Sequence, residues 1–224
     1  MSQTQSVVLL SGGLDSSYNL WRAHRDSEVV LVLTFDYGQK AARKEVETSA
    51  QLAQRLGLAH QVVHLPWFDL FTQTALVKAE AEVPKAEEVS LTDLGQAEQT
   101  AQRVWVPNRN GIFLNIAAGF AEGLGAEYVV VGFNREEAVT FPDNSQEFIW
   151  ALNQSLLFST ASQVKVRCYS TDMDKSQIVS SGHQLGLPFS ELWPCYLGGE
   201  SICGQCESCQ RYLRALKAGL PEGA

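Results

Sequence analysis

Residues 7–17 have the sequence Val-Val-Leu-Leu-Ser-Gly-Gly-Leu-Asp-Ser-Ser, and this stretch decides the fold. Its apolar start is typical of a short buried strand, and Asp15 opens a helical pattern that continues to about residue 25. The glycines between them let the backbone come close to a ligand, while the helix N-terminus adds N–H donors and partial positive charge. Ser11, Ser16 and Ser17 add hydroxyl groups. The stretch therefore predicts a loop for an oligophosphate; a plain strand–turn–helix connection is the alternative.

This loop differs from the two common glycine-rich phosphate motifs. No lysine follows the glycines, so the loop is not a Walker A motif, and its glycine spacing is not GxGxxG. Its chemistry must therefore rest on backbone N–H groups, hydroxyls and cations from elsewhere in the chain.

Outward from the loop, short apolar runs alternate with longer segments of helical periodicity. This alternation predicts βαβ units, a mainly parallel, doubly wound sheet and an α/β fold. Ligands of such sheets lie beyond the carboxyl ends of the strands, where we expect segments 11–17, 35–39, 107–110 and 132–143 to converge. The further predicted strands are 29–35, 61–65, 128–131 and 164–169, and the further helices are 39–56, 110–124, 145–158, 174–185 and 207–218.

Residues 66–106 interrupt the alternation. They carry seven acidic and three basic residues with weak periodicity, which predicts a long irregular excursion. Such an excursion in a compact domain is often a lid or binding loop, and a solvated surface insertion is the alternative.

Four of the five cysteines lie close together, at Cys195, Cys203, Cys206 and Cys209. Four thiolates fit one tetrahedral zinc ion and leave no open coordination position, so we expect one structural zinc per chain. An iron–sulfur cluster is also compatible with four cysteines. Cys168, in a predicted strand, is expected to be an inert core residue. We therefore divide the chain into a catalytic domain, 1–187, and a zinc-binding C-terminal region, 188–224.

The composition limits the possible partners. The 224 residues include 17 Lys and Arg against 25 Asp and Glu, a formal net charge of −8. A basic surface for nucleic acid or an anionic membrane is therefore not expected. No apolar run approaches the length of a membrane span, and the N-terminus lacks the basic start of a signal peptide, so we expect a cytoplasmic protein.

The loop of residues 11–17 resembles the SGGxDS loop of the PP-loop ATP pyrophosphatase (N-type) superfamily, whose fold is adenine nucleotide alpha hydrolase-like. Further segments narrow the resemblance to the 7-cyano-7-deazaguanine (preQ0) synthase family, over about residues 7–214. Departures from the family pattern are Ser17 in place of Thr, Glu137 in place of Asp, and the sequence of residues 141–145. The segments that carry the resemblance are 36–39, 106–110, 132–137, 141–144, 147–148, 174–175 and the cysteine run.

The resemblance implies an ATP-dependent ligase. Its substrates would be 7-carboxy-7-deazaguanine and ammonia, and its product the nitrile preQ0 of queuosine- and archaeosine-type tRNA nucleoside biosynthesis. The carboxylate would be adenylated, ammonia would displace AMP, and a second ATP-dependent activation would dehydrate the amide. ATP and Mg²⁺ would be required, no glutaminase signature is visible, and the resemblance suggests a homodimer.

The same resemblance assigns the site. Carboxylate and triphosphate are both anionic, so cations must gather at the pocket; Arg109 and Lys175 are the candidates, with Asp15 as a third catalytic residue. For both cations an exposed surface position is the alternative. Phe133 and Phe141 could equally be core, and Glu137 a solvated acid. The ATP-binding set is Leu10, Ser11, Gly12, Gly13, Leu14, Asp15, Ser16, Ser17 and Phe35. The substrate-binding set is Gln39, Asn108, Phe133, Asn134, Glu137, Phe141 and Asp143.

Two other function classes remain open on the sequence. A tRNA-modifying thiolase or lysidine-type ligase would share the loop but would need a basic face. A regulatory nucleotide-binding module with a zinc ribbon would bind ATP without releasing pyrophosphate. The charge argues against the first, and Asp15 with the loop hydroxyls argues against the second.

Overall fold

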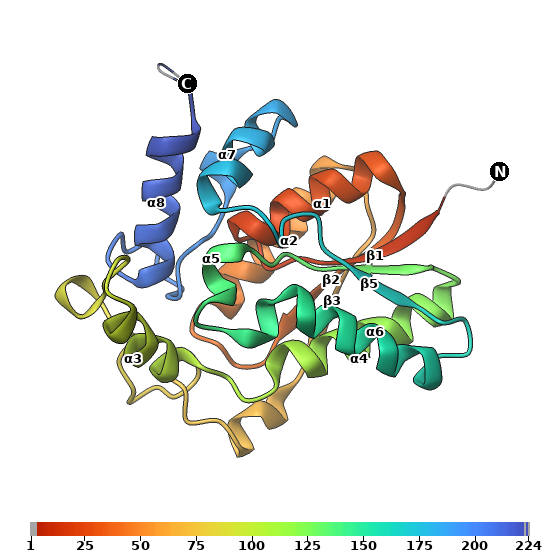
Figure 1. Ribbon diagram of the computed structural model, residues 1–224, viewed down its shortest axis with the longest axis horizontal. Coiled ribbons are helices and arrows are strands. Elements are labelled where there is room, and N and C mark those ends of the chain that lie inside the picture. Colours follow the sequence, from red (N-terminus) through yellow and green to blue (C-terminus); the bar gives the residue numbers. More distant parts are fainter. Residues whose placement is uncertain (1–3, 222, 224) are drawn as a thin grey trace.

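The computed structural model describes residues 4–221 and 223. Within these residues five parallel strands form one sheet in the order β3-β2-β1-β4-β5, which confirms the predicted doubly wound arrangement (Figure 1). The order reverses between β1 and β4, and this switch point places the end of β1 at the centre of the molecule. The strands are β1 Gln5–Leu9, β2 Glu28–Asp36, β3 His60–His64, β4 Tyr128–Val130 and β5 Lys165–Arg167.

Helices cover both faces of the sheet, because successive strand side chains point to opposite sides. In β1, Val7 and Leu9 pack into one apolar core and Val8 into the other. One face carries α1 Leu14–Asp26, α2 Ala42–Arg55, α7 Lys175–Gln184 and α8 Glu207–Gly219; the other carries α4 Arg109–Leu124 and α6 Gln146–Ser159 (Figure 1).

The prediction of an irregular excursion over residues 66–106 was wrong at its end, where a helix forms, and is confirmed over residues 71–84, which contain no helix or strand. The segment contains the 3-10 helices η1 Pro66–Leu70 and η2 Ala86–Glu88 and the helix α3 Leu94–Val104. The Asp93 side chain caps α3 by accepting a hydrogen bond from the Gln96 N–H at 3.0 Å. Phe68 of η1 is fully buried, with its ring centroid 5.8 Å from that of Phe113 in α4. The excursion is therefore a packed part of the fold.

The remaining predicted elements are present with small differences at their ends. The strand expected at 164–169 is limited to β5, and two further 3-10 helices, η3 Pro142–Asn144 and η4 Phe189–Glu191, interrupt connecting segments. A short helix, α5 Arg135–Ala138, follows β4. Among the described helices, none combines the length and the apolar character that crossing a bilayer requires. The predicted catalytic domain, 1–187, and the predicted C-terminal region, 188–224, include residues 1–3, 222 and 224, which lie outside the described residues.

Candidate functional site and cysteine cluster

The glycine loop follows β1 at the switch point of the sheet. Gly12 has φ +76°, and a Cβ there would lie 2.7 Å from Cγ2 of Thr48 in α2, so only glycine fits between the loop and this helix. The Ser16 hydroxyl accepts a hydrogen bond from the Ser11 N–H at 3.2 Å. The Trp193 N–H donates to the Gly12 carbonyl at 2.8 Å. The loop is thus held by α2 on one side and the C-terminal region on the other.

A cavity of about 240 Å³ opens beside this loop, at the carboxyl ends of the strands. All four segments that were expected to converge there contribute to its lining, and this confirms the predicted location. The lining also includes Leu76 and Val104 of the 66–106 segment, which favours the binding-loop alternative over a solvated insertion.

Lys175 lies at the centre of a compact charged cluster in this cavity. Its side chain is 4% exposed, and its Nζ lies 2.6 Å from Oδ2 of Asp15 and 2.8 Å from Oε1 of Glu137. Burial alone would lower the pKa of Lys175, but the two carboxylates outweigh it and raise that pKa, so the ammonium group stays charged. The alternatives of an exposed lysine and a solvated Glu137 are therefore wrong. Oδ1 of Asp15 is buried with no hydrogen-bond partner among the described residues.

Arg109 is the second cation of the cavity. It begins α4, is partly buried and has its Nη1 3.4 Å from the hydroxyl of Tyr37, so the surface alternative is wrong for Arg109 as well. Asn108 precedes it with φ +51°, a left-handed conformation that asparagine tolerates better than most residues. Its side chain makes no hydrogen bond that caps α4.

The segment after β4 forms the wall that faces the glycine loop. A Cβ on Gly132 would lie 2.4 Å from the backbone nitrogen of Ser16, so this glycine allows the two segments to touch. Phe133 is 3% exposed and lines the cavity, which combines the two interpretations given for it. The Phe141 ring also lines the cavity and stacks on Trp105 at an interplanar angle of 7°.

Most of the predicted site residues line this cavity. They are Leu10, Ser11, Gly13, Leu14, Asp15, Ser16, Phe35, Gln39, Arg109, Phe133, Glu137, Phe141 and Lys175. Five others lie outside its lining: Gly12, Ser17, Asn108, Asn134 and Asp143. Asn134 is fully buried and its Oδ1 accepts a hydrogen bond from the Glu137 N–H at 3.0 Å, so it positions Glu137. Direct contact of these five with a ligand stays a prediction.

Several lining residues were not assigned to this site from the sequence, and two groups of them bear on its chemistry and construction. One is Glu45, in the first turn of α2, which no motif marks. The other comes from the C-terminal region and comprises Trp193, Pro194, Cys195, Tyr196, Ser208 and Tyr212. The predicted catalytic domain, 1–187, and the predicted zinc-binding region, 188–224, therefore both line the cavity, and the cysteine region forms one of its walls.

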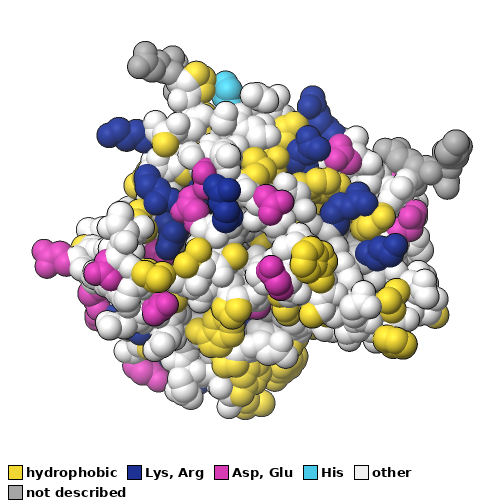
Figure 2. All heavy atoms as spheres, viewed as in Figure 1, with side chains coloured by type: hydrophobic (Ala, Val, Ile, Leu, Met, Phe, Trp, Pro, Cys, Tyr) yellow, Lys and Arg dark blue, Asp and Glu magenta, His cyan; other side chains and the backbone are white. Residues whose placement is uncertain are grey.

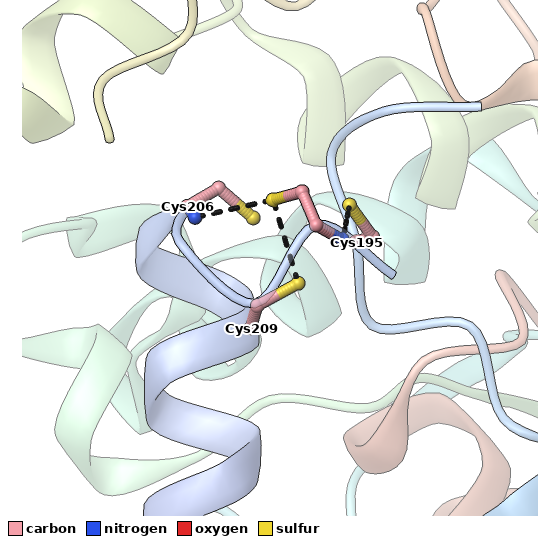
Figure 3. A group of neighbouring side chains, drawn as sticks. Cys195, Cys206 and Cys209 are labelled. Carbon is pink, nitrogen blue, oxygen red and sulfur yellow. Dashed lines mark hydrogen bonds between the residues drawn. The ribbon is translucent and has the colours of Figure 1, made fainter. Parts of the chain in front are cut away.

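The four clustered cysteines converge next to this wall. Their sulfur atoms all lie within 4.8 Å of one another, and Figure 3 shows Cys206 and Cys209 at the start of α8 with their side chains directed toward Cys195 on the preceding loop. Tetrahedral zinc with bonds of about 2.3 Å separates its sulfur ligands by about 3.8 Å, close to the 3.9 Å between Cys203 and Cys209. Backbone N–H groups of Leu197 and Cys203 donate to the Cys195 sulfur at 3.4 Å. This donor set fits a thiolate-bound metal.

Cys168 lies apart from this cluster. Its side chain is partly buried against the core just after β5, where its sulfur accepts a hydrogen bond from the Phe133 N–H at 3.3 Å. Burial raises the pKa of the Cys168 thiol, as expected for the inert core residue that the sequence predicted.

Ion pairs join the cysteine helix to the catalytic side. Arg211 of α8 is 7% exposed and donates to Glu207 at 2.7 Å and to Glu136 of α5 at 3.3 Å. The Lys175 N–H donates to the other oxygen of Glu136 at 2.9 Å. Glu136 therefore bridges the helix that carries Cys209 and the helix that begins with Lys175.

Comparisons with known proteins agree with this architecture. The family model described as "Queuosine biosynthesis protein QueC" matches residues 5–219. The chain is 52% identical to the 7-cyano-7-deazaguanine synthase of Bdellovibrio bacteriovorus, over 93% of this chain and 91% of that protein. It is 42% identical to the protein of the same name from Methanosarcina mazei, over 95% and 94%. A 4-thiouridine synthetase solved with RNA and ATP shares the adenine nucleotide alpha hydrolase-like fold, at 16% identity and a TM-score of 0.50, over 96% of this chain and 52% of that one.

Proposed function

The chain belongs to the QueC family of queuosine biosynthesis proteins, and from this premise we propose that it converts 7-carboxy-7-deazaguanine and ammonia into 7-cyano-7-deazaguanine at the expense of ATP. The observation that carries the proposal is the cavity itself. It brings a glycine-rich anion loop, Lys175 and Arg109 to the switch point of a doubly wound sheet. A triphosphate and a carboxylate can meet there, because cations balance the charge of both.

The reaction proceeds through two activations. The substrate carboxylate attacks the α-phosphorus of ATP and pyrophosphate leaves, which gives an acyl adenylate. Ammonia then forms the C–N bond and AMP leaves. In the second activation the amide oxygen attacks another ATP, and loss of AMP and protons from the adenylated amide forms the nitrile. Each activation needs the same loop for the departing pyrophosphate, so one cavity serves both.

We divide the site residues by the ligand that each would bind. We assign Ser11–Ser17, Leu10 and Phe35 to ATP, with Lys175 and Arg109 holding the phosphates and the carboxylate. Lys175 is fixed by Asp15 and Glu137, so its ammonium group points to one place without reorganisation. Gln39, Phe133, Glu137 and Phe141 are assigned to the deazaguanine, whose flat ring can lie against aromatic faces. Asn108, Asn134 and Asp143 support them from outside the lining.

Mg²⁺ fits the same place. Magnesium takes oxygen ligands from one or two carboxylates and from substrate phosphates, and Oδ1 of Asp15 is a buried oxygen without a partner among the described residues. When bound, the ion would neutralise phosphate charge.

We propose one structural zinc at Cys195, Cys203, Cys206 and Cys209. Metal analysis of the purified protein tests this assignment, since the colour and iron of a cluster would contradict it.

The protein is further proposed to act as a cytoplasmic homodimer on small molecules, without a nucleic-acid or membrane partner. Figure 2 shows apolar side chains gathered at the lower edge of one face, where Figure 1 places the segment after β3. Trp67, Leu70 and Phe71 of that segment are 42%, 84% and 41% exposed, and a second copy could cover them. Leu70→Asp should then shift the mass measured by light scattering toward the monomer.

The activity is tested by incubating the protein with 7-carboxy-7-deazaguanine, ammonium, ATP and Mg²⁺ and measuring product masses. The nitrile is expected, and Ser16→Ala should slow its formation. Ser155→Ala changes an exposed serine of α6 and serves as the matched control. An unchanged deazaguanine, together with ATP turnover on another carboxylate or on tRNA, would contradict the substrate assignment.

A further inference from the structure

The cavity contains one carboxyl group to which neither the motifs nor the proposed mechanism gives a role. Glu45 lies in the first turn of α2, beside the glycine loop, with its backbone oxygen 3.7 Å from the position of a Cβ on Gly12. Its side chain lines the cavity and Oε2 accepts a hydrogen bond from Nε2 of Gln39 at 2.8 Å. No described lysine, arginine or histidine forms an ion pair with it within 4.0 Å.

Glu45 differs in this respect from the other acids of the cavity. Asp15 and Glu137 both contact Lys175, and the charge of each is balanced there. The Gln39 amide that touches Glu45 is itself fixed, because it donates to the Phe35 carbonyl at 3.0 Å and accepts from the Tyr37 N–H at 2.9 Å. Glu45 therefore offers the cavity a positioned carboxyl group with a free oxygen, Oε1.

The groups that face Glu45 come from three elements. Burial raises the pKa of Glu45 to about 7, and the charge of Asp36 at the end of β2 adds to this rise. The Gln39 hydrogen bond and the charge of Arg109 on α4 oppose it. Tyr37, which follows β2, is neutral because burial raises its pKa further. A carboxyl group balanced in this way can both accept and release a proton near neutral pH.

We propose that Glu45 binds the ammonium ion in the cavity and accepts a proton from it, which delivers ammonia to the acyl adenylate. This assignment rests on the proposed function. Ammonium carries no lone pair, so it must lose a proton before it can attack. Among the described cavity residues, Glu45 is the carboxylate that has no ion-pair partner within 4.0 Å, and an ammonium ion supplies one.

One N–H bond of ammonium breaks and its proton moves to Oε1 of Glu45. The nitrogen lone pair then forms the C–N bond at the acyl carbon, the C–O bond to the phosphate breaks, and AMP departs with that electron pair. The nitrogen loses one further proton to solvent as the neutral amide forms, and Glu45 returns its own proton to solvent before the next turnover.

The test separates this step from adenylation. Glu45→Gln keeps an acceptor oxygen for Gln39 but cannot take a proton. The carboxylate-dependent exchange of labelled pyrophosphate into ATP should persist in this variant. Amide formation from ammonium should fall about a hundredfold, within the range of a positioned general base. Hydroxylamine is uncharged at neutral pH, so its reaction with the acyl adenylate should keep the wild-type rate.

Glu47→Gln provides the matched control, because Glu47 lies on the same helix but is exposed and pairs with Arg43 at 3.2 Å. This variant should behave as the wild type in all three reactions. Equal loss with ammonium and hydroxylamine in Glu45→Gln would overturn the proposal and leave Glu45 a positioning residue. Full activity with ammonium, or loss of the exchange, would overturn it too. Absence of exchange in the wild type would instead mean that the proposed function fails.

Discussion

The two walls of the cavity are built in different ways. The phosphate wall is a contiguous stretch, Ser11–Ser17, whose geometry follows from glycines and a helix start. A second wall, next to the first, is assembled from Trp193, Tyr196, Ser208 and Tyr212, which reach the cavity because the four cysteines and α8 hold the C-terminal region in place. The first wall depends on local backbone geometry, whereas the second depends on long-range packing and on the metal that the sulfur atoms fit.

The largest effect is expected from breaking the cysteine wall. Cys206→Ser removes one of four ligands, and structural zinc in isolated fingers contributes about 10–16 kcal/mol of folding free energy. The variant should lose its metal, ATP binding and activity, and its C-terminal region should become sensitive to protease. Cys168→Ser is the control, because Cys168 lies outside the cluster. Retention of ATP binding after metal loss would show that the two walls are independent.

The next effect concerns the charge between the walls. Lys175→Met leaves Asp15 and Glu137 buried without their cation, which should cost about 3–5 kcal/mol of unfolding free energy. Adding Glu137→Gln should recover part of this loss, since one uncompensated carboxylate is then removed. Urea denaturation measures both effects, with Lys217→Met, at an exposed lysine of α8, as control. If Lys175→Met lost no more unfolding free energy than the loss of an ordinary surface ion pair, Lys175 would not be the buried partner of Asp15 and Glu137.

A smaller effect is expected from crowding the phosphate wall. Gly132→Ala places a Cβ 2.4 Å from the Ser16 nitrogen, and backbone atoms cannot rotate away as a side chain can. We expect a loss of about 1–3 kcal/mol and weaker ATP binding, measured by urea denaturation and calorimetry. Gly123→Ala in α4 meets no atom within 4 Å and should instead stabilise the helix by about 0.8 kcal/mol. Equal effects of the two variants would contradict the close approach at Gly132.

The two walls also differ in how well they could be predicted from the sequence alone. The doubly wound parallel sheet, the glycine loop and the cysteine cluster depend on short patterns, and all three were predicted. The helix α3 was missed because Asp93 is followed by Leu94 and Gly95, a weak start for an apolar pattern. The C-terminal lining residues were missed because they are placed by long-range contacts, such as the packing of α8 on α7 and the hydrogen bond from Trp193 to the Gly12 carbonyl. Glu45 was missed because one glutamate in a helix start is common, and only its neighbours make it unusual.

The smallest effect is expected where the two walls are joined, at Glu136. Burial would raise the pKa of this carboxyl, but the Lys175 N–H and the charges of Arg214 and Arg211 outweigh it and hold the pKa below the ordinary value. A carboxyl with a lowered pKa stabilises the folded state above its unfolded pKa, and this stabilisation is lost as pH falls through the folded pKa. Glu136→Gln should therefore cost about 1.5 kcal/mol near neutral pH.

That cost should shrink as pH falls through the lowered pKa of Glu136, because the wild-type carboxyl then becomes protonated and is neutral like the amide of the variant. Metal loss from the cysteines at low pH affects both proteins, so the difference between their unfolding free energies is the quantity to compare. Glu147→Gln, at an exposed carboxylate of α6, should show no difference at either pH. If the Glu136→Gln deficit stayed constant with pH, the charge of Glu136 would not be what joins the cysteine helix to the helix of Lys175. The two walls would then be held together by packing alone.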